Sequence, residues 1–149
     1  MMRTVRFNAR AIVVSLLVAM PLFAQVAEGD RHYAARAEGA SGARAKATEI
    51  DAAIASYERA IAQNANDLDA HGKLLRAYRF RGAYVATSVE EKKRIYGSAK
   101  TAGDRALAAV ARALASRGVK ADGPEKTVAN AARTLPGAGI IYLWDAVNW

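Results

Sequence analysis

The chain has 149 residues, with no cysteine and only two histidines, His32 and His71. The absence of cysteine excludes disulfide bonds, thiolate metal sites, cysteine nucleophiles and lipid anchors attached to cysteine. The separation of the two histidines matches no metal-binding motif. We therefore expect no metal site and no cofactor.

Catalytic motifs are also missing from the sequence. It contains no Gly-x-Ser-x-Gly elbow, no Walker loop, no His-Glu-x-x-His motif and no close carboxylate pair of the catalytic kind. The adjacent acids Glu90 and Glu91 suit the positive end of a helix dipole, so we interpret them as the charged start of a helix. A hydrolase or transferase is disfavoured, and we expect no catalytic residues and no enzyme activity.

Proline and alternating β-branched runs are scarce, whereas alanine is abundant. Three prolines and the shortage of such runs argue against a β-sheet. Hydrophobic residues make up 52% of the chain, which is enough to bury a core. Because much of that fraction is alanine, we expect thin, closely packed helices and an all-α fold.

Residues 1–24 have the pattern of a secretory leader. Three arginines in the first ten residues precede an apolar stretch at 11–23, and small residues follow at Ala24 and Ala27. The apolar stretch is shorter than the roughly 20 residues that a membrane span requires. We predict cleavage after Ala24, with an uncleaved amino-terminal anchor as the alternative. In either case residues 25–149 are expected to leave the cytoplasm and to form one domain.

The excess of basic residues is moderate once the leader is set aside. The sequence has 22 basic and 14 acidic residues, a formal net charge of +8. Three of the basic residues and none of the acidic ones lie in residues 1–24, so the remainder carries a dispersed net charge of +5. We interpret this charge as an aid to solubility. We expect no nucleic-acid partner, and membrane contact only through an uncleaved leader.

A clear amphipathic helix is predicted over Thr48–Gln63. Thr48 and Asp51 have the spacing of a helix-capping signal. The buried stripe of this helix, at offsets of four, three and four, consists of Ile50, Ile54, Tyr57 and Ile61. The Asn and Asp residues at 64–67 are expected to form the turn that ends it.

A second helix is predicted to follow that turn and to run to about Phe80. Asp67 or Asp69 can cap its start, and Gly82 fits its end. Its predicted buried face comprises Leu68, His71, Leu74, Leu75 and Tyr78. We interpret His71 as a packed structural residue. The arginines spread around the outside of this helix, and expected to be solvated, are Arg76, Arg79 and Arg81.

After a loop at Ala83–Val89, a long helix is predicted from about Ser88 to Ser116. Ser88 and Glu91 form a second capping box. The inner stripe of this helix consists of Ile95, Ala99, Ala102, Ala106, Val110 and Leu114. Because the helix is so long, part of it should project beyond its neighbours.

The remaining segments are less regular. A first helix is predicted within Glu28–Lys46, weakened by Gly39 and Gly42. A short helix is predicted over Lys126–Leu135. The apolar and aromatic segment Ile140–Trp149 is expected to begin another helix, which the sequence ends without a stop signal.

The two helices on either side of the 64–67 turn resemble a tetratricopeptide repeat. The residues that carry the resemblance are Ala53-x-x-x-Tyr57-x-x-Ala60 and Leu74-Leu75-x-x-Tyr78-x-x-x-Gly82. Ala65 replaces the common helix-ending proline, and His71 replaces the usual tryptophan. The resemblance implies tetratricopeptide-like antiparallel helical hairpins that form a short α-solenoid.

Over Tyr33–Trp149 the chain is also similar to the T-component family of tripartite ATP-independent periplasmic (TRAP) transporters. The matching motifs are Ala53-Ile54-x-x-Tyr57-Glu58-x-Ala60, Lys73-Leu74-Leu75-Arg76-Ala77, Glu90-Glu91-Lys92-Lys93 and Tyr142-Leu143-Trp144-x-Ala146-Val147-Asn148-Trp149. The resemblance implies a periplasmic binding and assembly module that self-associates and pairs with the transporter's substrate-binding protein. It also implies that the natural chain continues past Trp149.

The residues that we expect to contact a ligand or partner are aromatic: Tyr78, Tyr96, Tyr142, Trp144 and Trp149. Core packing is the favoured alternative at Tyr78, which occupies a packing position of the repeat. Trp144 and Trp149 are five residues apart and cannot share one helix face well. One hypothesis is an apolar groove that takes a small apolar solute without covalent chemistry. The other is a general envelope scaffold that binds an extended peptide or another protein on its concave face.

Overall fold

A computed structural model describes residues 22–149 of the chain, so most of the predicted leader lies outside the described residues. Its helices are α1 (Leu22–Ala35), α2 (Ala47–Gln63), α3 (Leu68–Phe80), the π-helical turn η1 (Arg81–Val85), α4 (Val89–Ala115), α5 (Glu125–Arg133) and α6 (Ala138–Asn148). Within this part of the chain there is no strand, only an isolated bridge between Ser41 and Arg44. The predicted all-α class is confirmed.

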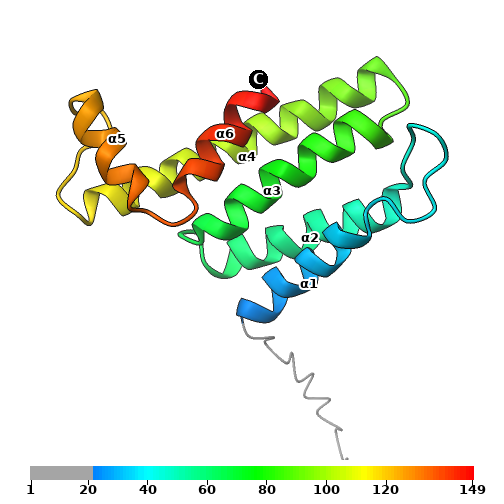
Figure 1. Cartoon of the computed structure of the whole chain (residues 1–149), viewed down its shortest axis with the longest axis horizontal. Coiled ribbons are helices and arrows are strands. Elements are labelled where there is room, and N and C mark those ends of the chain that lie inside the picture. The colour runs from blue at the N-terminus through cyan, green and yellow to red at the C-terminus, as the bar shows by residue number, and fades with distance from the viewer. Residues whose placement is uncertain (1–21) are drawn as a thin grey trace, which may run out of the picture.

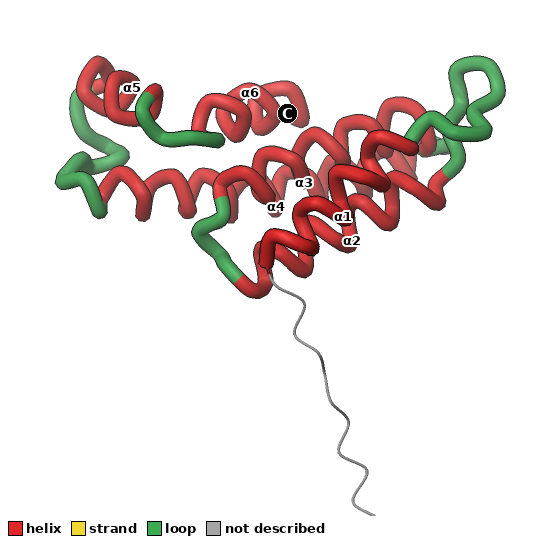
Figure 2. Tube along the Cα trace, turned by 60° about the horizontal axis from the view of Figure 1, so that its bottom comes forward, coloured by secondary structure: helices red, strands yellow, loops and turns green. Residues whose placement is uncertain are grey.

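The chain reverses direction at each connection from α1 to α4, so that neighbouring helices run antiparallel (Figure 1). Helix α6 returns along the layer formed by α3 and α4 and packs on both of them (Figure 2). Helix α4 extends past α3, and its far end carries α5 (Figure 1). The long helix therefore projects beyond its neighbours, as its length predicted.

The core lies where the apolar stripes of α2, α3 and α4 meet, with α6 covering one side. The predicted stripes of α2 and α4 are buried along their whole length. In α3, Leu74 and Leu75 are fully buried. The small members of the α4 stripe, which allow its backbone to approach the neighbouring helices, are Ala99, Ala102 and Ala106. Helical periodicity thus identified most of the core.

Two of the three predicted helix caps are present. The Asp67 carboxylate accepts a hydrogen bond from the Ala70 amide at 3.0 Å, and the Ser88 hydroxyl accepts one from the Glu91 amide at 3.0 Å. The expected cap at Thr48 is wrong, because α2 begins one residue earlier, at Ala47. Just before this start, the Ala45 amide donates to the Tyr84 carbonyl of η1 at 3.0 Å, which fixes the chain there.

The bounds of the first helix were also predicted wrongly. Helix α1 spans Leu22–Ala35, so it contains the predicted cleavage point after Ala24 and ends well before Lys46. The chain then turns at Gly39 and Gly42, whose φ angles of +66° and +56° are left-handed. Side chains other than glycine rarely adopt this conformation, so these glycines shape the turns that follow the helix and are not part of it.

Gly82 does not stop α3 as expected. The helix passes into the π-helical turn η1, and only residues 86–88 form the loop before α4. A Cβ atom on Gly82 would lie 2.6 Å from Cζ of Tyr96. This glycine is required because the Tyr96 ring packs directly on the backbone.

Helix α1 is attached to α2 and α3 through a buried tyrosine. The Tyr57 side chain of α2 has no exposed surface, and its hydroxyl donates to Oδ1 of Asp30 at 2.8 Å. Lys73 of α3 donates to Oδ2 of the same carboxylate at 2.7 Å. Burial, together with the bond to Asp30, raises the pKa of Tyr57 well above its ordinary value. Asp30 therefore links three helices, with the phenol as a permanent donor.

We predict that Gly29→Ala destabilises the fold, because its Cβ would lie 2.5 Å from Cε1 of the buried Tyr57 ring. The expected loss of unfolding free energy is up to about 2 kcal/mol, after subtracting the better helix propensity of alanine from the cost of overpacking. The matched control is Gly97→Ala in α4, which meets nothing within 4 Å and should gain about 0.5–1 kcal/mol. Urea unfolding measures the stability of both variants. A gain of stability in both would contradict the packing of Tyr57 against Gly29.

The structural role predicted for His71 agrees with its position. The residue is 2% exposed, and its Nε2 lies 3.2 Å from the Ala65 carbonyl oxygen. Burial lowers the pKa of His71 below its ordinary value near 6.5. The unfolded chain therefore binds this proton at a higher pH than the folded chain. The folded state therefore has its full stability with respect to this group above about pH 6.5. The free energy of unfolding decreases as the pH falls below that value.

We predict that wild-type protein loses stability between pH 7.5 and 5.5 more steeply than the variant His71→Gln. The glutamine amide can donate to the same carbonyl but does not titrate. The difference in slope cannot exceed about 1.4 kcal/mol per pH unit for one proton. Urea unfolding across this pH range measures both slopes. Equal slopes would contradict the prediction, because they would show that protonation of buried His71 does not lower the free energy of unfolding.

Candidate functional site

Helix α6 presents apolar side chains both to the core and to solvent. Ile141 and Asn148 are buried, and Asn148 Nδ2 donates to the Leu75 carbonyl of α3 at 3.1 Å. The apolar residues of α6 with between 37% and 77% of their surface exposed are Ile140, Tyr142, Leu143, Val147 and Trp149 at its end. One face of α6 therefore holds the helix on α3 and α4, while several of its other apolar side chains remain partly exposed.

A hollow of about 560 Å³ separates α5 from the start of α6. We call this hollow the α5–α6 groove. Its lining consists of Ala121, Gly123, Glu125, Val128, Ala129, Ala132, Arg133, Gly139 and Tyr142. The space exists because small residues of α5 face Gly139 of α6 across the gap.

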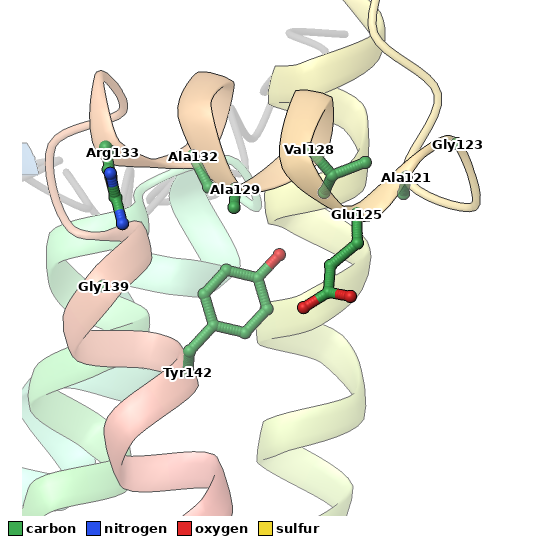
Figure 3. Close-up of a pocket in the computed structure, with 9 residues that line it drawn as sticks. All are labelled: Ala121, Gly123, Glu125, Val128, Ala129, Ala132, Arg133, Gly139 and Tyr142. Atoms are coloured by element: carbon green, nitrogen blue, oxygen red, sulfur yellow. The ribbon is translucent and has the colours of Figure 1, made fainter.

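The polar groups of the α5–α6 groove stand apart from one another. In Figure 3 the Tyr142 ring projects from α6 toward α5, and the Glu125 carboxylate points into the gap beside it. Arg133 lies toward the opposite end, near the start of α6. One carboxylate, one guanidinium and one phenol thus surround a floor of small and apolar side chains. This arrangement can orient a ligand by its polar groups while its apolar part fills the gap.

The five predicted contact residues do not share one surface. Tyr142 lines the α5–α6 groove, whereas Trp144, two residues later in α6, lines a separate hollow formed with α1 and α3. Trp149 is 77% exposed, and Lys100 Nζ lies 4.2 Å from its ring centroid. The two tryptophans face different sides, as their spacing predicted.

Tyr78 and Tyr96 are half-buried and take part in packing. The Tyr78 hydroxyl donates to Glu58 at 2.9 Å at the edge of a hollow of about 300 Å³. Tyr96 lies against Gly82, with its hydroxyl 3.4 Å from Nη1 of Arg79. Packing accounts for both positions.

The sequence interpretation missed the role of arginines on α3. Arg81, expected to be solvated, pairs with Asp51 at 2.6 Å and with Glu91 at 3.2 Å. Arg76 and Arg79 line the same hollow as Trp144, as does Arg36 after α1. The three-residue spacing of Arg76 and Arg79 shows that they share a side of α3. The sequence does not show that α1 and α6 dock beside this side of α3, which is visible only in the structure.

Neither a membrane-spanning helix nor a metal-binding cluster is present among the described residues. Between residues 22 and 149 no helix combines the length and the apolar character needed to cross a membrane. In the same range no three His, Asp or Glu side chains gather in a way that could hold a metal ion. Comparisons of the chain with protein-family models, with curated proteins and with solved structures find no match.

Proposed function

We propose that this chain is a periplasmic helical binding module that serves a TRAP-type transporter and receives the apolar part of a solute in the α5–α6 groove. The observation that carries the proposal is the hollow of about 560 Å³ beside the exposed apolar side chains of α6. Similarity to the T-component family supports the transporter assignment. Binding is passive, and no covalent step takes place.

The size and lining of the groove support a small apolar ligand. Ligand pockets commonly measure about 300–1,000 Å³ and are mostly apolar, with a few polar groups that fix orientation. Here Val128, Ala132 and the Tyr142 ring supply apolar contact. Each 100 Å² of apolar surface removed from water contributes about 2.5 kcal/mol, so a ligand of naphthalene size has enough driving force to bind.

The outward residues of α6 support contact with a partner protein. Leu143 and Val147 are four residues apart, so they share one side of α6, and both are exposed. Exposed apolar patches of this kind are typical of protein interfaces. Under the proposal this patch meets the transporter's substrate-binding protein. A general envelope scaffold would use the same patch for a different protein, which makes the identity of the partner the deciding observation.

We predict that Ala129→Trp blocks the groove, because Ala129 lines the hollow and is itself exposed. The dye 1-N-phenylnaphthylamine, which fluoresces in apolar surroundings, should bind the full chain purified without detergent. The variant should weaken this binding at least about tenfold, a loss of roughly 1.4 kcal/mol. Fluorescence titration measures both affinities.

The control for the blocked groove is Ala62→Trp. Ala62 is an exposed alanine of α2, a helix with no packing contact to α5 or α6. This variant adds the same ring and should bind the dye as the wild type does. Equal dye binding by Ala129→Trp and wild type would contradict a ligand site in the groove.

We predict that the double variant L143E/V147E abolishes binding to the substrate-binding protein of the TRAP transporter encoded beside this chain's gene. Two carboxylates in the centre of an apolar interface would be desolvated without partners, which costs several kcal/mol. The control A27E/A62E adds the same charge at exposed positions of α1 and α2. Co-elution in size-exclusion chromatography with light scattering measures binding.

The proposed transporter role fails if the wild-type chain does not bind that protein, or if no such transporter gene lies nearby. A complex that survives L143E/V147E would instead move the contact away from α6. A wild-type dimer that the same variant dissociates would assign the patch to self-association.

A further inference from the structure

A second hollow, of about 400 Å³, lies where the end of α1 meets α3, η1 and α6. Its lining consists of Tyr33, Arg36, Arg76, Arg79, Phe80, Ala83, Tyr84 and Trp144. We call it the arginine–aromatic cleft. It brings three guanidinium groups and four aromatic rings together from segments far apart in the sequence, and neither the core nor the α5–α6 groove includes most of them.

The guanidinium groups of the cleft are held against aromatic rings. Arg76 Cζ lies 4.0 Å from the centroid of the Tyr33 ring, and Arg36 Cζ lies 4.2 Å from the same centroid. Arg79 Cζ lies 5.6 Å from the Tyr96 centroid. Stacking of this kind orients a guanidinium while leaving its in-plane N–H donors directed sideways.

The three positive charges of the cleft have no carboxylate partner in the described chain. Across residues 22–149 none of Arg36, Arg76 and Arg79 comes within 4.0 Å of an acidic oxygen, whereas Arg81 at the start of η1 pairs with two acids. Residues 1–21 contain no Asp or Glu. Asp30 of α1 has both oxygens occupied, one by Tyr57 and the other by Lys73.

Hydrogen-bond donors of the cleft are also left over. The Nε atoms of Arg36 and Arg76 are buried and have no hydrogen-bond partner among the described residues. Buried donors without an acceptor cost free energy, and most native proteins pair them. The protein itself therefore leaves both an unbalanced charge and unused donors at one place.

Aromatic rings that contact one another form another wall of the cleft. The Phe80 and Tyr84 centroids are 4.9 Å apart, and Tyr33 meets Phe80 edge to face at 6.4 Å. Tyr84 is 49% exposed, so the wall reaches the surface. A flat apolar body can stack on such a wall while an attached anion faces the arginines.

We propose that the arginine–aromatic cleft binds an organic anion, namely a carboxylate carried on a flat apolar body. The carboxylate accepts hydrogen bonds from the guanidinium groups of Arg36 and Arg76, and Arg79, whose guanidinium contacts Tyr96, adds positive charge. The body stacks against Phe80, Tyr84 and Trp144. A planar carboxylate matches the fork geometry of guanidinium groups. This site goes beyond the apolar groove proposed above and depends on none of its residues.

The test uses 2-naphthoate as the probe and its neutral analogue 2-naphthamide, titrated into the full chain by calorimetry. We expect naphthoate to bind at least about tenfold more tightly than the amide, and to lose affinity as KCl is raised from about 50 to 300 mM. Equal binding of the two compounds, or no binding of naphthoate at about 5 mM, would overturn the proposal.

Variants of the arginines assign the binding to the cleft. Arg76→Gln should weaken naphthoate binding by about tenfold or more, as expected for a charge-assisted hydrogen bond to a carboxylate. Arg36→Gln is the second variant, because Arg36 follows α1 and lies outside the helices. The control Arg94→Gln removes an exposed arginine of α4 outside the cleft and should change nothing.

The groove variant separates this proposal from the preceding one. Ala129→Trp should leave naphthoate binding unchanged, since Ala129 lines only the α5–α6 groove. If Ala129→Trp removes naphthoate binding while Arg36→Gln and Arg76→Gln do not, the anion binds in the groove and the cleft proposal is wrong. If the dye fails to bind but naphthoate binding depends on the arginines, the cleft proposal stands without the groove.

Discussion

The hydrogen bond from the buried Tyr57 hydroxyl to Asp30 is the interaction on which the arrangement of the first three helices depends. A phenol that is fully buried needs an acceptor, and the acceptor is supplied by α1. Lys73 of α3 neutralises that acceptor, so α1 lies where α2 and α3 can both reach it. This docking carries Tyr33 and Arg36 to α3, and the arginine–aromatic cleft exists only because of it.

A second constraint acts on α6, which has more apolar surface than the core can cover. Its inner face is satisfied by Ile141 in the core and by the bond from Asn148 to the Leu75 carbonyl. An eleven-residue helix with apolar side chains on every side then necessarily exposes some of them. Exposed apolar surface of this kind promotes aggregation in an isolated domain. It serves as a binding surface if a ligand or partner covers it.

The sequence allowed good prediction of features that depend on local spacing, and poor prediction of those that depend on docking. The stripes of α2 and α4 and the caps at Asp67 and Ser88 follow from side chains a few residues apart, and the structure contains them. The path of the chain after α1 was missed because the left-handed turn at Gly39 depends on how the following segment returns to α2. Arg76 was assigned to solvent because nothing near it in the sequence indicates that α1 and α6 enclose that side of α3.

Both proposed sites share α6 as a wall, and this follows from helix geometry. Tyr142 and Trp144 are two residues apart, which places them about 200° apart around the helix axis. Tyr142 lines the groove toward α5, and Trp144 lines the cleft toward α1 and α3. The exposed Leu143 and Val147 belong to the same helix, so a partner seated on them contacts the element that carries both walls. Under both proposals a ligand in either hollow would touch the helix that would also meet the partner.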